Sequence, residues 1–160
     1  MNWKWMVLAG AIVIAGFGLS GCEKAALDRQ VEELCRKDGG VKVYETVMLP
    51  PEIFDQDGNP FPGWRARPLV DRLGPEYRYL RETAILKDGD PHKLLSEGVL
   101  RRNSEKIIRV SDSKLMGESV VYGRTGGEAI LLGHPSGTMC PTLKSADETL
   151  IRSVFINKGE

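Results

Sequence analysis

A helical stripe is the first regular pattern after residue 22. In EKAALDRQVEELCRKDGG, residues 23–40, apolar side chains recur at helical spacing and share one face. These side chains are Leu27, Val31, Leu34 and Cys35. Basic residues close the segment and two glycines follow, as is typical of a helix C-terminus. The pattern predicts a helix that directs Cys35 toward the core.

Alternation of apolar and polar positions then predicts strands. VKVYETVML (41–49) and EYRYLRETAILK (76–87) alternate with a period of two and are rich in β-branched or aromatic residues. Residues 92–125 predict three more strand segments, with a turn at DSK between KIIRV and LMGESVVYG. The stretch RNSE (102–105) is either another turn or the interior of one long strand.

The end of the chain is less regular. GRTGGEAILLGHPSGTMCP, residues 123–141, is rich in Gly and predicts a loop that reaches Cys140. ADETLIRSVFINK predicts a short helix capped by Ser145 or Asp147, although SVFIN looks like an edge strand. We therefore predict a single α+β domain over residues 22–160, with the N-terminal helix packed on an antiparallel meander of about four strands.

A Pro-rich segment, PPEIFDQDGNPFPGWRARP, separates the first two predicted strands. Its prolines and glycines predict a long loop over residues 50–68. The aromatic residues of this loop are Phe54, Phe61 and Trp64. We expect these rings to pin the loop to the core. The alternative is that they form an exposed contact surface for a partner protein.

The amino-terminal stretch, MNWKWMVLAGAIVIAGFGLSGC, has the layout of an export signal. Lys4 precedes a run from Trp5 to Phe17 in which every residue is apolar or Gly, and small residues come before Cys22. A membrane-spanning helix is the alternative. Such a helix usually needs ~20 apolar residues, whereas this run is shorter and contains several glycines.

The last four residues of that stretch, Leu19-Ser20-Gly21-Cys22, resemble the lipobox of bacterial lipoproteins. The resemblance implies cleavage before Cys22, a diacylglyceryl thioether on its sulfur and an acyl chain such as palmitate on its amine. Two or three acyl chains anchor a protein stably, whereas one chain is marginal. Residues 1–21 would then be the signal peptide, and the rest of the chain would face the periplasm on a lipid anchor. The alternatives are a signal peptide that is cut without lipidation, or an ordinary cysteine at position 22.

Residue 23 bears on which membrane holds the anchor. Enteric lipoproteins that stay at the inner membrane tend to carry Asp directly after the lipidated cysteine. This chain carries Glu23 instead, which favours the outer membrane.

The three cysteines fit this interpretation. Lipid on Cys22 leaves Cys35 and Cys140, and the periplasm is an oxidising compartment. We predict a Cys35–Cys140 disulfide, with two buried free thiols as the alternative. Neither cysteine lies in a CxxC motif, so a catalytic thiol is disfavoured.

Charge excludes some classes of partner. The chain has 22 Lys and Arg against 22 Asp and Glu, and loss of the signal peptide would remove only Lys4. A nearly neutral domain argues against a nucleic-acid partner and against an electrostatic grip on the membrane. The arginines of the predicted meander are expected to form a solvated face balanced by carboxylates, with an anionic ligand as the alternative. They are Arg101, Arg102, Arg109 and Arg124.

Catalytic patterns are weak. SDSK at 111–114 matches the SxxK of penicillin-binding enzymes, but it lies in a predicted strand turn rather than at a helix start. An enzyme would need a polar pocket around His134 and Ser136. With two histidines and two paired cysteines we expect no metal site, and we expect no cofactor and no catalysis.

Two blocks, LCRKDGGVKVYETVMLPPEIFD and RVSDSKLMGESVVYGRTGG, resemble a family of short lipoproteins of Gram-negative bacteria for which no activity is known. The resemblance implies a location and no mechanism. The expected function is that of a lipid-anchored periplasmic lipoprotein of the cell envelope, with an accessory or binding role toward an envelope protein. The alternative is an inhibitor or exclusion factor that acts on an incoming enzyme or phage component.

Overall fold

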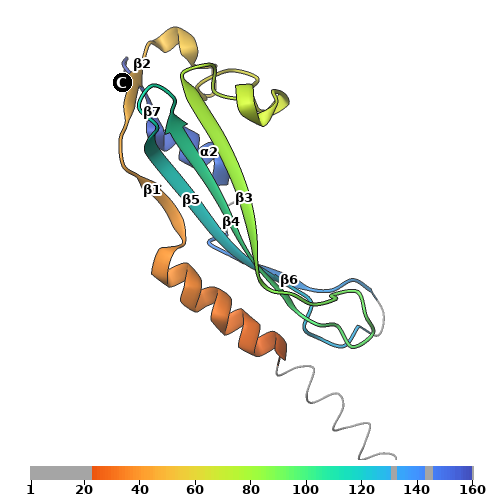
Figure 1. Cartoon of the computed structure of the whole chain (residues 1–160). Helices are drawn as coiled ribbons and strands as arrows, with labels where there is room; N and C mark the ends of the chain where they lie inside the picture. The colour runs from red at the N-terminus through yellow and green to blue at the C-terminus, as the bar shows by residue number, and fades with distance from the viewer. Residues whose placement is uncertain (1–22, 131–132, 143–145, 160) are drawn as a thin grey trace, which may run out of the picture.

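The computed structural model describes residues 23–130, 133–142 and 146–159 (Figure 1). An N-terminal helix covers residues 23–38. The remaining elements are β1 (Gly40–Val43), β2 (Val47–Leu49), β3 (Tyr77–Lys87), β4 (Val99–Arg109), β5 (Lys114–Thr125), β6 (Gly137–Cys140), α2 (Ala146–Val154) and β7 (Phe155–Asn157). Three 3-10 turns, Pro51–Ile53, Trp64–Ala66 and Leu69–Asp71, lie in the segment between β2 and β3.

The main sheet is built on an antiparallel meander of β3, β4 and β5. On the edge of β5 that faces away from β4, β1 pairs with residues 117–120 and β6 pairs with residues 122–125. The sequence prediction of an α+β fold, with an N-terminal helix and an antiparallel sheet, is confirmed. The stretch 102–105 lies inside β4, so the long-strand interpretation holds there.

The two helices cover opposite faces of this sheet. Leu27 and Val31 of the N-terminal helix pack with Val120 of β5. A Cβ on Gly117 of β5 would instead meet Leu150 and Val154 of α2. Residues 117 and 120 are an odd number of positions apart in a strand without a bulge between them, so they point to opposite faces.

The core under α2 is aromatic. Phe155 packs edge-on against Tyr77, with ring centroids 4.8 Å apart, and against Phe61 at 5.0 Å. Pairs with this geometry add to the gain from burial. Phe155 also begins β7, which pairs in parallel with β2 to form a second, two-stranded sheet. These contacts tie the C-terminal strand to the Pro-rich segment.

Four local predictions were wrong. Residues 41–49 form two strands, because Tyr44 and Glu45 both turn their backbone N–H groups to the Met116 carbonyl. Residues 92–98 form a loop rather than a strand, and residues 137–140 form β6 rather than a loop. The supposed edge strand SVFIN is split, because α2 continues to Val154 before β7 begins.

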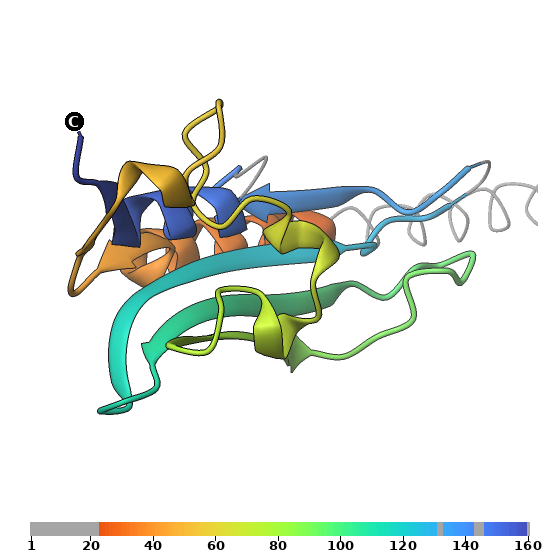
Figure 2. The same cartoon turned by 90° about the horizontal axis from the view of Figure 1, so that it is seen from above.

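The molecule has two distinct ends. Figure 2 shows the β3–β4 loop projecting at one end of the sheet and the β4–β5 turn at the other. Within the described residues, no helix has the length and apolar character needed to cross a membrane. The predicted signal peptide, residues 1–21, and the predicted lipid site, Cys22, lie outside the described residues.

Candidate binding surface

Two grooves lie beside the start of β3. The first has a volume of 420 Å³, and its lining residues are Pro75, Glu76, Tyr77, Arg109, Val110 and Ser111. The second has a volume of 260 Å³, and its lining residues are Leu49, Pro50, Ile53, Phe61, Leu73, Gly74, Pro75, Glu76 and Tyr77. Both grooves share Pro75–Tyr77, so we treat them together as the distal surface.

We call the segment that both grooves share, Pro75–Tyr77, the ridge, and its position follows from the backbone around it. Gly74 has a φ of 79°, a left-handed conformation that favours glycine, and it reverses the chain from the third 3-10 turn into β3. Pro75 then fixes its own φ through its ring and so stiffens this turn. Val110 donates its N–H to the Glu76 carbonyl at 2.9 Å, which fixes this ridge to the β4–β5 turn.

Four charged side chains beside the distal surface, at and near the β4–β5 turn, are paired with one another. Arg109 contacts Glu45 and also Asp112, the latter at 2.7 Å, while Lys114 contacts the other oxygen of Glu45. The hydrogen bond from Arg109 lowers the pKa of Asp112 to about 2, and the same guanidinium lowers the pKa of Glu45. These groups frame the β4–β5 turn without leaving a large uncompensated charge.

Apolar side chains remain exposed around that frame. Met48 of β2 is 57% exposed, Tyr44 is 55% exposed and Val110 is 44% exposed. The apolar side chains that line the two grooves suit contact with a protein or peptide better than capture of a small ion.

The three aromatic candidates of the Pro-rich segment have different environments. Trp64 is only 4% exposed and lies between the guanidinium groups of Arg65 and Arg72, at 5.0 and 5.1 Å from its ring. Its indole therefore pins the segment to the core and is not an exposed contact. Phe61 is half-buried against the core and lines the second groove. Phe54 is half-buried in a separate groove of 240 Å³ beside α2 and β7.

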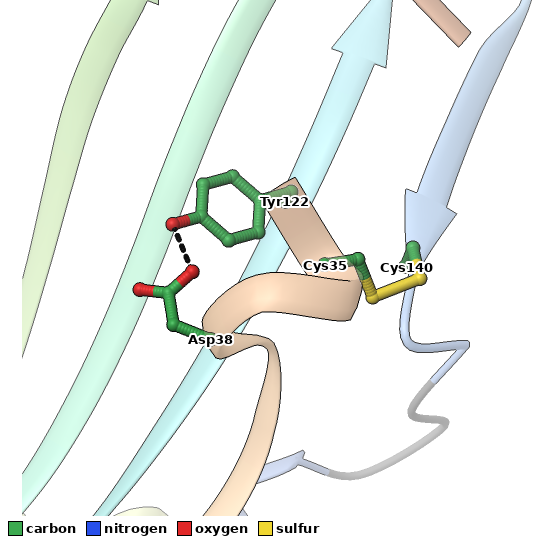
Figure 3. The surroundings of a disulfide bond; sticks show 4 residues. All are labelled: Cys35, Asp38, Tyr122 and Cys140. Atoms are coloured by element: carbon green, nitrogen blue, oxygen red, sulfur yellow. Dashed lines mark hydrogen bonds between the residues drawn. A yellow bond between two sulfur atoms is a disulfide. The ribbon is translucent and has the colours of Figure 1, made fainter. Parts of the chain in front are cut away.

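The predicted Cys35–Cys140 disulfide is confirmed (Figure 3). It joins the N-terminal helix to β6, and the Cα atoms are 5.7 Å apart. One turn further along the helix, Asp38 accepts a 2.7 Å hydrogen bond from the Tyr122 hydroxyl. The end of the helix is thus fastened to two neighbouring strands by one covalent and one polar contact.

Arg124 is a buried arginine at the end of the sheet opposite the distal surface, and its contacts hold that end together. The side chain of Arg124 is 2% exposed, and its guanidinium donates to Asp28 at 2.7 Å and to the Ser136 hydroxyl at 3.2 Å. Glu128 completes the network, since it accepts the Ser136 N–H and contacts Arg124 at 3.4 Å. The network satisfies the buried charge and links the N-terminal helix to the loop before β6.

Two other arginines of the meander are balanced by carboxylates, as expected. Arg102 lies 3.3 Å from Glu118, and Arg109 is paired as described above. Together with Arg124, these side chains are committed to contacts within the protein. The described residues give no support for a shared anion site on the meander.

The residues of the candidate catalytic pair have separate roles in the fold. Ser136 belongs to the Arg124 network, whereas His134 is exposed. Among the contacts of the described residues, no hydrogen bond joins His134 to Ser136. The described part of the chain also holds no cluster of three or more His, Cys, Asp or Glu side chains suited to a metal ion.

Comparison with known proteins gives no relative from which a function could be carried over. No protein-family model, no curated protein and no solved structure matches this chain.

Sequence reasoning did not single out the distal surface itself. Of its lining residues, Phe61 was a candidate, but Glu76, Tyr77 and Val110 were not. The Gly74–Pro75 pair carries a local signal, because such a pair marks a turn before a strand. The other side of the first groove comes from the β4–β5 turn. That turn lies beside Pro75–Tyr77 only because β3 and β4 pair in this register.

Proposed function

We propose that this protein is a lipid-anchored lipoprotein of the bacterial envelope that holds the distal surface toward a partner protein. The role is one of binding and not of catalysis. The lipobox-like residues before Glu23 support the anchor, and the two apolar-rimmed grooves support the binding role.

One observation carries the orientation. Glu23, the residue after the proposed lipid site, is bonded to Lys87 at the end of β3, whereas the grooves adjoin Tyr77 at its start. A strand of 11 residues separates the two points, and such a strand is roughly 33 Å long. A chain anchored at Cys22 would therefore hold the distal surface away from the membrane.

The chemistry of the surface points to a protein segment as the partner. The second groove is lined largely by Leu, Ile, Pro and aromatic side chains, and suits an apolar anchor residue. The first groove places Glu76 beside the apolar wall of Tyr77 and Val110. A partner segment with one apolar side chain and a neighbouring basic or amide group would complement both grooves.

The test uses the whole chain in cells, with a photoreactive amino acid placed at single positions. Ser111 lies in the first groove, and Glu32 is a matched control on the exposed face of the N-terminal helix. We expect the Ser111 variant to crosslink to one envelope protein and the Glu32 variant to crosslink to none. Equal crosslinking from both positions, or none from Ser111, would overturn the binding role.

The same crosslinking experiment tests the alternative function, and a separate variant tests the anchor. Crosslinks from Ser111 that form only when an incoming enzyme or phage component is supplied would favour an inhibitor or exclusion factor. The anchor is tested by Cys22→Ala, which should accumulate as an uncut precursor; normal processing of that variant would contradict lipidation.

A further inference from the structure

The end of the molecule opposite the distal surface carries its own exposed apolar pair. Leu94 and Leu95, in the β3–β4 loop, are 65% and 61% exposed. Both values exceed those of the apolar side chains around the distal surface. Exposed leucines side by side on a loop need an explanation, because a soluble surface gains nothing from them.

This loop is held in place by its neighbour. The Leu94 carbonyl accepts the Ile130 N–H at 2.8 Å, and the Ser96 N–H donates to the Glu128 carbonyl at 3.2 Å. Leu95 and Ala129 form an isolated antiparallel bridge. We call the loop 88–98, with Leu94 and Leu95 at its surface, the apolar tip. Because these backbone groups bond to protein, the tip meets a requirement for contact with lipid.

The apolar tip also lies beside the start of the N-terminal helix. Glu23 accepts the Gly98 N–H at 3.2 Å and pairs with Lys87 at 2.8 Å, and these two residues flank the loop. Lys24 donates its N–H to the Gly127 carbonyl at 3.1 Å, in the segment that supports the tip. Figure 1 shows the helix start and the β3–β4 loop at the same end of the molecule.

We propose that the apolar tip inserts Leu94 and Leu95 into the interface of the membrane that anchors the chain. The inference rests on the proposed function, since it needs acyl chains at Cys22. A membrane is the partner that the tip would contact, because Cys22 directly precedes the start of the N-terminal helix, which lies beside the tip. Any bilayer that holds Cys22 is therefore within reach of the tip. The lipid and the two leucines would then hold the domain by two separate attachments and fix its tilt.

The tip carries no basic patch, because Asp88 and Asp90 add negative charge to it. Lys93, next to Leu94, is already paired with Glu97 at 3.2 Å. The insertion should therefore occur on zwitterionic lipid and should be insensitive to salt, unlike the binding of a basic patch to anionic headgroups.

The experiment uses the mature lipidated chain reconstituted in phosphatidylcholine vesicles whose acyl chains carry bromine, a quencher of tryptophan fluorescence. Leu95→Trp reports on the tip. Met48→Trp is the matched control, because Met48 is 57% exposed at the opposite end of the molecule. The buried Trp64 contributes the same background to both variants.

We expect the added tryptophan of Leu95→Trp to be quenched at least about twofold more than that of Met48→Trp, with a blue-shifted emission. Equal quenching of the two variants on vesicles that retain the chain would overturn the tip proposal and leave the proposed function intact. If the mature chain purified from cells carries no acyl groups and stays in the supernatant instead of binding the vesicles, the proposed function is overturned, and the tip proposal with it.

Discussion

The carboxylate of Glu23 lies 2.8 Å from the ammonium group of Lys87 and also accepts the backbone N–H of Gly98 at 3.2 Å. One side chain thus joins the first described turn of the N-terminal helix to both sides of the β3–β4 loop. It also makes this end of the molecule sensitive to acid.

Acidification should release this contact. The hydrogen bond from Lys87 lowers the pKa of Glu23 and outweighs partial burial, which would raise it. A lowered pKa in the folded state means that the contact stabilises the protein above the unfolded value of ~4.3 and is lost as pH falls through the folded value. Urea unfolding of the parent and of Glu23→Gln should give different stabilities at neutral pH, and the difference should shrink as the pH falls below the unfolded value of ~4.3.

Lys87→Met is the control for that prediction. In its background, Glu23→Gln should have little effect at any pH, because the partner of the carboxylate is already gone. A difference between parent and Glu23→Gln that is as large in acid as at neutral pH would contradict the assignment.

Reduction of the Cys35–Cys140 disulfide should destabilise the domain strongly. The two cysteines are 105 residues apart, and closing a loop of that size in the unfolded chain corresponds to about 3–5 kcal/mol. Urea unfolding with and without reductant measures the loss. The double variant Cys35→Ala with Cys140→Ala should match the reduced parent and ignore reductant. An unchanged midpoint after reduction would show that the bridge does not constrain the unfolded chain.

Gly117→Ala should weaken the packing of α2 on the sheet. An added Cβ would lie 2.8 Å from Val154 and 3.0 Å from Leu150, both fully buried. Overpacking of this kind costs about 1–3 kcal/mol. Gly123→Ala, in the same strand, is the control, because its Cβ would meet the exposed, flexible side chain of Met139. Thermal unfolding of both variants decides the matter, and equal stability would refute the packing argument.

Trp64→Ala should cost far more stability than Phe54→Ala. Truncating a fully buried Trp removes about 3–5 kcal/mol, and Trp64 is 4% exposed in the core cluster around Tyr79. Phe54 is half-buried, so its truncation removes fewer contacts. Denaturant unfolding measures both losses. Similar losses for the two variants would mean that the segment is not pinned mainly by its indole.

Much of the fold could be predicted from local patterns. The stripe of Leu27 and Val31 gave the N-terminal helix, and the alternation of residues 76–87 gave β3. The Cys35–Cys140 pair followed from the number of cysteines, because a third cysteine had a separate explanation. The apolar pair Leu94–Leu95 was misinterpreted as part of a strand, since two adjacent leucines fit several structures equally well.

The parts that could not be predicted depend on contacts distant in sequence. β2 and β7 are only three residues long, and although both fall within segments predicted as strands, neither segment shows where its strand begins or that the two strands pair with each other. The distal surface likewise needs the ridge at Pro75 and the turn at Val110 to meet across the sheet. Amino-acid composition does not show which segments, distant in sequence, lie side by side in the fold.

The late position of Phe155 has a consequence for how the chain matures. Its ring fills the space between Tyr77 and Phe61, and its strand completes the second sheet. A chain that is threaded through a translocation pore with its amino end first would deliver Phe155 after nearly every other core residue. Until then the aromatic pocket stays open, so the emerging chain would need a holding chaperone for longer than a protein whose core closes from its early segments.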